Sequence, residues 1–143
     1  MTAVHVGLGT ALIAVNLAAG LWGAFGWWRR RHVPGFWPLL RTGQALVVLQ
    51  AIDGAVLLLT GRELPDLHLV YGLVPIGVSF IAEQLRLAAA DTVLAQRGLE
   101  GRADVEALPA GEQRALVRAI LRREMGVMAA SALVVTALGV RAL

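Results

Sequence analysis

The sequence contains no cysteine and no lysine, and it carries little charge of either sign. Without cysteine the chain forms no disulfide, no thiolate metal site and no cysteine nucleophile. Charged residues make up 16% of the 143 residues and hydrophobic residues 57%, whereas a soluble domain carries about 25% charged residues. We therefore expect a single domain with much of its surface facing lipid.

All 13 basic residues are arginines, and the net charge is +3. The arginines flank apolar segments and do not form one patch, which argues against nucleic acid as a partner. The bias toward Ala, Leu, Val, Gly and Arg is typical of bacteria with GC-rich genomes, so we expect the plasma (inner) membrane of a bacterium. No basic stretch precedes the first apolar run, and we therefore expect no cleaved signal peptide.

Four apolar segments reach or approach the length of about 20 residues that a helix needs to cross a bilayer. They comprise residues 3–28, 37–60, 67–85 and 125–140. Residues 87–96 continue the third helix, and the whole region of about 86–124 is predicted to form a helical hairpin that extends the bundle. The sequence thus predicts an all-α fold, an integral membrane four-helix bundle in one domain over residues 1–143.

Eleven arginines fall on one side of the four spans and only Arg62 and Arg141 on the other. Because positively charged flanks stay in the cytoplasm, we expect both termini outside and the helical extension in the cytoplasm. Four tryptophans at the cytoplasmic end would form an aromatic belt: Trp22, Trp27, Trp28 and Trp37.

Two histidines, His5 and His68, begin the first and third spans on the outer side, at nearly the same depth. Each is followed one helical turn later by a glycine, Gly9 or Gly72, so the side chain that would lie beside the imidazole is missing. This leaves room for a flat group, and neutral imidazole is a usual axial ligand of haem iron. The pattern favours a b-type haem (haem b) held by both histidines near the outer face.

Asp53 lies in the second span, roughly 10 Å from its outer end at about 1.5 Å per residue. A carboxylate at such a depth costs about 3 kcal/mol unless it is paired, and it is therefore a candidate functional residue. It can accept the ring N–H of a ligating histidine. It can instead be the third ligand of a two-His-one-carboxylate site for non-haem iron or another divalent metal. Arg62, just before His68, would pair with haem propionates.

The segment GQALVVLQAIDGAVLLLTG (residues 43–61) and the following LPDLHL (residues 64–69) resemble a helical hairpin of the haem A synthase family. In that family a Gln- and Gly-rich helix ends in a Leu-Thr-Gly-like turn, and the next helix opens with a haem-ligating histidine. The resemblance implies a four-helix haem bundle with His68 as a ligand, and it matches His5 to the histidine of the preceding helix.

Two departures from the family change the expected activity. The family's first ligand lies in a Glu-x-x-His-Arg pattern, whereas Thr2 and Val6 occupy the flanking positions around His5. The family's enzymes also contain two such bundles, and this chain has the length of one. We therefore expect electron transfer or haem handling in oxidase assembly rather than haem A synthesis.

Other functions remain open on the sequence. It has no Walker, Gly-x-Ser-x-Gly or His-Glu-x-x-His motif and no paired catalytic carboxylates, so only the resemblance points to an enzyme. Its small size and glycine-rich helix faces also suit a subunit without haem. Such a subunit would pack against a larger respiratory or haem-handling membrane complex, or against a second copy.

Three further expectations concern the cytoplasmic side. His32 is expected to be a solvated loop residue, and Met125 and Met128 are expected to pack in the core. Four charged residues are expected to form an interhelical ion-pair network: Glu83, Arg86, Arg123 and Glu124.

Overall fold

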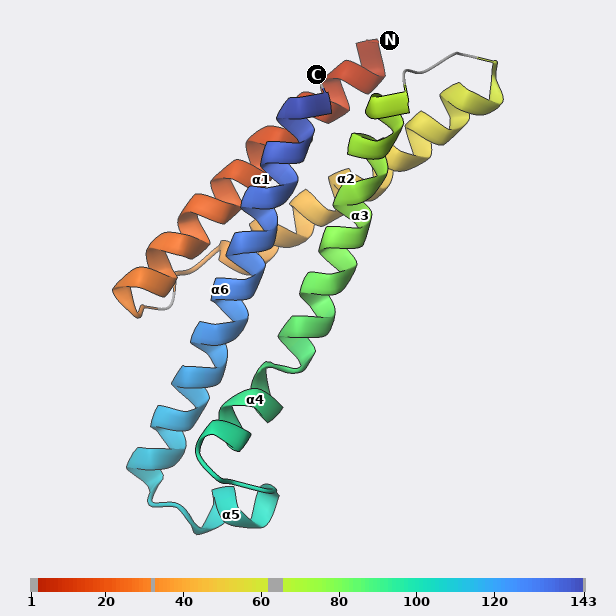
Figure 1. Cartoon of the computed structure of the whole chain (residues 1–143). Helices are drawn as coiled ribbons and strands as arrows, with labels where there is room; N and C mark the ends of the chain where they lie inside the picture. Colours follow the sequence, from red (N-terminus) through yellow and green to blue (C-terminus); the bar gives the residue numbers. More distant parts are fainter. Residues whose placement is uncertain (1–2, 32, 62–65, 143) are drawn as a thin grey trace.

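The computed structural model describes residues 3–31, 33–61 and 66–142, and all the secondary structure in these ranges is helical (Figure 1). The helices are α1 (Ala3–Arg29), α2 (Phe36–Leu59), α3 (Asp66–Leu87), α4 (Ala89–Gln96), α5 (Arg102–Ala107) and α6 (Ala110–Ala142). Of these, α1, α2, α3 and α6 are long and apolar enough to cross a membrane. The predicted all-helical fold with four candidate membrane-spanning helices is confirmed.

One boundary agrees with the prediction and one differs from it. Residues 112–124, expected as an amphipathic run that leads into the fourth span, form one helix with it, so α6 has 33 residues. The predicted continuation of the third helix is interrupted at Ala88, after which α4 begins. Helices α4 and α5 and the first turns of α6 extend beyond the connection between α1 and α2 (Figure 1).

The long helices pack in an uneven bundle. Helix α6 lies between α1 and α3, and α2 packs mainly on α1, whereas α2 and α3 touch each other much less. The starts of α1 and α3 and the ends of α2 and α6 lie at one end of the bundle (Figure 1), which we call the histidine end. The end where α1 finishes and α2 begins is the arginine end.

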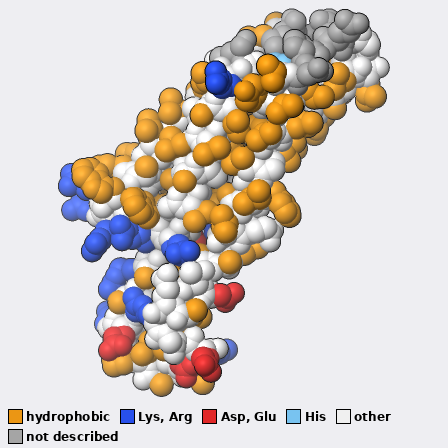
Figure 2. Space-filling model, in the orientation of Figure 1, with side chains coloured by type: hydrophobic (Ala, Val, Ile, Leu, Met, Phe, Trp, Pro, Cys, Tyr) orange, Lys and Arg blue, Asp and Glu red, His pale blue; other side chains and the backbone are white. Residues whose placement is uncertain are grey.

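The distribution of side chains is the reverse of that in a soluble protein. Large apolar side chains such as Leu21, Ile52 and Phe80 are more than half exposed, at 58%, 56% and 65%, and hydrophobic surface covers the long helices in Figure 2. The inward face of α1 buries mostly small or polar residues: His5, Leu12, Asn16, Ala19, Gly20, Gly23 and Gly26. Such an arrangement suits a lipid solvent, in which small and polar residues form the contacts between helices.

Glycine is required where α1 approaches its neighbours. A Cβ at Gly23 would lie 2.8 Å from the Cβ of Ala129 on α6, and one at Gly43 of α2 would lie 2.8 Å from Asn16 Oδ1. Asn16 is 1% exposed, and its Nδ2 donates to the carbonyls of Leu12 at 2.9 Å and Gly43 at 3.3 Å. Close backbones and one interhelical hydrogen bond therefore hold α1 in place.

The arginine end contains the larger apolar core. Met125 and Met128 are 8% and 0% exposed and pack with Phe36 and Leu40 of α2. The predicted core role of both methionines is confirmed. Gly35, with φ of 82°, adopts the left-handed conformation that lets the chain turn into α2.

Candidate functional site

At the histidine end, residues of α1, α2, α3 and α6 line a cavity of about 220 Å³. Most of its wall comes from α2 and α3, which touch each other much less than α1 touches α2 or α6. The wall is mainly apolar, but His5, Gln50 and His68 all lie in it. The cavity is therefore an apolar space with a few polar groups at its edge, as ligand sites commonly are.

His5 contacts two side chains of α2. It is 5% exposed, its Nδ1 lies 2.8 Å from Asp53 Oδ2, and its Nε2 lies 3.1 Å from Gln50 Nε2. A carboxylate accepts and an amide nitrogen donates, so Nδ1 carries the proton and Nε2 the lone pair. A Cβ at Gly54 would lie 3.7 Å from His5 Cε1, an ordinary van der Waals contact, so Gly54 adjoins the ring.

His68 is held by backbone of α6. Its Nδ1 lies 2.9 Å from the carbonyl oxygen of Ala142, the last residue of that helix. Because a carbonyl only accepts, Nδ1 again carries the proton, and in the neutral ring Nε2 carries the lone pair. The centroids of the His5 and His68 rings are 5.7 Å apart and their planes are inclined by 47°. Two imidazoles from separate helices thus converge at one cavity.

Asp53 lies against His5 as its hydrogen-bond partner. Within residues 3–31, 33–61 and 66–142, no three His, Asp or Glu side chains gather so that they could hold a metal ion. The arrangement favours the orienting role for Asp53 over the role of a third ligand.

The two glycines expected beside the histidines differ in their surroundings. A Cβ at Gly72 would meet nothing within 4 Å, whereas a Cβ at Gly9 would lie 3.3 Å from Gln50 Nε2. Gly72 therefore borders open space, and Gln50 fills part of the space beside Gly9. Arg62 and His32 lie outside the described residues.

Three groups of this site were not among the expected site residues: Gln50, Gly54 and the Ala142 carbonyl. Gln50 Oε1 is buried and has no hydrogen-bond partner in the described part of the chain. The sequence could have indicated Gln50 as a site residue, because Gln50 and Asp53 are the polar side chains in the second half of α2. The Ala142 carbonyl carries no such signal, since which terminal carbonyl meets His68 depends on packing.

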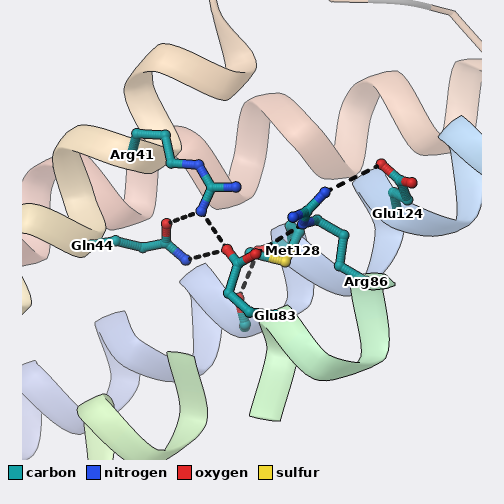
Figure 3. A network of polar contacts seen from close by, with 7 residues as sticks. Arg41, Gln44, Glu83, Arg86, Glu124 and Met128 are labelled. Carbon is teal, nitrogen blue, oxygen red and sulfur yellow. Dashed lines mark hydrogen bonds and ion pairs between the residues drawn. The ribbon is translucent and has the colours of Figure 1, made fainter. Parts of the chain in front are cut away.

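A second polar cluster joins α2, α3 and α6 at the arginine end (Figure 3). Glu83 accepts hydrogen bonds from Arg41, from Gln44 at 2.9 Å and from Arg86 at 2.8 Å. Arg86 also lies 3.9 Å from Glu124. The cluster pairs each carboxylate with an arginine, so we interpret it as a structural clamp between helices.

The predicted network is confirmed for Glu83, Arg86 and Glu124, and wrong for Arg123. In the described ranges no ion pair or hydrogen bond involves the Arg123 side chain, which is exposed. Arg41 of α2 instead supplies the second guanidinium, because the start of α2 lies beside the end of α3.

Comparison of the chain with protein-family models, with curated proteins and with solved structures found no match. The fold places the protein in a broad class, helical bundles with four helices that are long and apolar enough to cross a membrane.

Proposed function

We propose that the protein is a small membrane b-type haem protein with His5 and His68 as axial ligands. The observation that supports this proposal best is the distance of 5.7 Å between the two ring centroids. Two imidazole nitrogens at about 2 Å from one metal ion, with ring centres about 1 Å further back, would place the centroids roughly 6 Å apart.

The partners of the two rings support the same assignment. A metal-ligating histidine almost always donates its other N–H to a carboxylate or a backbone carbonyl. Asp53 accepts from Nδ1 of His5, and the Ala142 carbonyl accepts from Nδ1 of His68. Both rings would therefore carry a lone pair on Nε2, and iron at His5 would take the place of the Gln50 amide, which donates to that nitrogen at 3.1 Å in this structure.

The walls of the cavity suit a flat apolar group. Leu12, Val47 and Leu73 supply apolar surface, and Gly72 leaves the backbone of α3 uncovered. The volume of about 220 Å³ is below the range of about 300–1,000 Å³ for drug-sized ligands, so the site encloses part of a porphyrin. The remainder would lie between α2 and α3, which contact each other little.

Bis-histidine haem supplies one-electron transfer, and it leaves no axial position open for oxygen. The protein's own part is to orient the two imidazoles and to exclude water with apolar walls. We therefore propose electron transfer or haem handling, with a respiratory or haem-handling membrane partner. The resemblance of residues 43–69 to the haem A synthase family agrees with this role.

The proposal includes an orientation. The arginine end would face the cytoplasm of a bacterial inner membrane, because eleven of the 13 arginines flank the spans on that side. Both termini and the haem would then lie at the outer face, and α4 and α5 would be cytoplasmic.

Absorption spectra of the purified protein test the haem proposal. We expect a sharp Soret band and split visible bands on reduction. His5→Ala and His68→Ala should each abolish this spectrum or convert it to a five-coordinate one, while His32→Ala should not change it.

A folded, colourless preparation from haem-replete cells that takes up no added haemin would overturn the proposal. Metal analysis then separates the remaining functions. Stoichiometric non-haem iron, zinc or copper would favour a site with Asp53 as third ligand, and a defined co-purifying protein without metal would favour the haem-free subunit.

A further inference from the structure

Helices α1 and α6 border a second, shallower hollow at the arginine end, a groove of about 540 Å³. Trp27 and Arg123 lie at its polar end, and Leu133 is its last residue along α6. The floor between them is formed by small or apolar residues: Ala24, Gly126, Val127, Ala129 and Ala130. The ten residues from Arg123 to Leu133 span roughly 15 Å of helix. This length is about half of the hydrocarbon core, which is about 30 Å thick, and so equals one leaflet.

Two donors at the polar end of the groove have no acceptor in the described part of the chain. They are the guanidinium of Arg123, which the network around Glu83 does not include, and the indole Nε1 of Trp27. The Trp27 ring is held in position from two sides. The ring packs against Gly126, where a Cβ would lie only 2.7 Å from Trp27 Nε1. Arg122 Cζ also lies 5.0 Å from the ring centroid.

More uncompensated positive charge surrounds this end. Arg122 Nε donates to the Trp27 carbonyl at 3.0 Å. Arg29 lies over the rings of Phe25 and Trp28, at 5.7 and 5.6 Å. No carboxylate pairs with either arginine among the residues that the structure describes. Figure 2 shows arginines gathered where α1 ends.

We propose that this groove binds one anionic glycerophospholipid. Its phosphate would accept hydrogen bonds from Arg123 and from Trp27 Nε1, and one acyl chain would lie on the floor toward Leu133. Basic pockets between membrane helices commonly hold anionic headgroups. A zwitterionic lipid would place an ammonium group among unpaired arginines, so the site selects net negative charge. This proposal does not depend on the haem.

Native mass spectrometry of the delipidated full-length protein in mild detergent tests the site. Phosphatidylglycerol and phosphatidylcholine with identical acyl chains are compared at equal concentrations. We expect phosphatidylglycerol to bind about tenfold more tightly, because both lipids carry the phosphate but only the choline headgroup brings a positive charge among the unpaired arginines. Inorganic phosphate at the same concentration should not displace it, which distinguishes a lipid site from a phosphate site.

Two variants locate the binding. Arg123→Gln removes a donor to the phosphate and should weaken phosphatidylglycerol about tenfold, whereas Arg141→Gln, with the same change of charge at the histidine end, should leave its affinity unchanged. Ala130→Phe fills the groove from an exposed position and should weaken both lipids. Because Arg123 is exposed and makes no contact in the clamp, its variant remains informative even if Ala130→Phe misfolds.

Equal binding of both lipids by the unaltered protein would overturn the proposal. So would an unchanged affinity for phosphatidylglycerol in Arg123→Gln. Displacement by inorganic phosphate would make the site a general anion site. A dimer that retains no lipid and that Ala130→Phe converts to a monomer would show that a second copy covers the groove.

Discussion

His5 and Asn16 are both buried polar side chains of α1, and α2 satisfies both of them. Asp53 and Gln50 contact the two ring nitrogens of His5, and the carbonyl of Gly43 accepts from Asn16. A hydrocarbon solvent offers no hydrogen bonds, so a polar group on a membrane helix needs a partner within the protein. The surroundings of the two residues differ, because His5 lines the cavity at the histidine end and Asn16 does not.

Asp53→Asn should retain the haem but raise its reduction potential. The amide oxygen can still accept from His5 Nδ1, but the loss of a negative charge disfavours the oxidised, more positive iron. A potentiometric titration monitored by absorbance measures the change. Asp91→Asn, on exposed surface of α4, should leave the potential unaltered. Equal potentials in the unaltered protein and Asp53→Asn would contradict the orienting role of Asp53.

Asn16→Ala should lower the free energy of unfolding by about 1 kcal/mol, the usual scale for an interhelical hydrogen bond in a membrane protein. Unfolding with SDS in mixed micelles measures it. Thr10→Ala is the matched control, because the exposed Thr10 hydroxyl bonds only the Val6 carbonyl of its own helix. A loss of similar size in both variants would mean that the contact with Gly43 contributes nothing.

Among the helices, α1 and α6 form the close-packed pair, and α2 and α3 the loose one. Gly20 and Gly23 allow α1 to contact Leu133 and Ala129 of α6 directly. Between α2 and α3, the polar contacts to Glu83 tie the arginine end, whereas the cavity separates the two helices at the histidine end. The bundle is therefore fixed at one end and able to admit a ligand at the other.

Gly23→Ala tests the close packing of α1 on its neighbours. The added Cβ would meet the Phe36 ring of α2 and would lie 2.8 Å from Ala129 Cβ of α6, so we expect a loss of about 1–3 kcal/mol of stability from overpacking. Gly77→Ala in α3 is the control, since its Cβ would meet nothing within 4 Å. It should be neutral, or stabilising by up to about 1 kcal/mol, because alanine favours the helix. Thermal unfolding in detergent compares the two, and a stable Gly23→Ala protein would argue against this packing.

For the whole molecule, the dominant feature is the asymmetry of charge along the bundle. Arginines gather at the arginine end (Figure 2), and α4, α5 and the start of α6 continue beyond it (Figure 1). The membrane potential and anionic lipids both favour positive charge on the cytoplasmic side, which gives the molecule a definite orientation to test.

Single cysteines can test the orientation directly, since the chain has no cysteine of its own. Cysteine substituted for Arg62 or for Leu143 should react with an impermeant maleimide in whole cells, and cysteine at Gly101 should react only after lysis. Both labelling patterns can be read on a gel. Labelling of intact cells at Gly101 alone would reverse the proposed topology.

The sequence by itself determined the spans, because transfer into lipid is a property of each apolar segment and needs no knowledge of its neighbours. It also determined which face of a span points inward, since polar and small residues recur at helical spacing. His5, Asp53 and His68 could therefore be proposed as one group before any packing was known. The continuity of α6 was also readable, because residues 112–124 keep helical spacing up to the fourth span and nothing in them breaks a helix.

Only the tertiary structure decided which partners these residues meet. Asp53 could have paired with either histidine, and its position opposite His5 follows from the packing of α2 on α1. The carbonyl that holds His68 comes from a helix end 74 residues away in sequence. Arg123 directly precedes Glu124, yet it faces a groove and not the clamp, because α6 turns about 100° per residue. Contacts between helices depend on rotation and depth of two elements at once, and a single sequence pattern specifies neither.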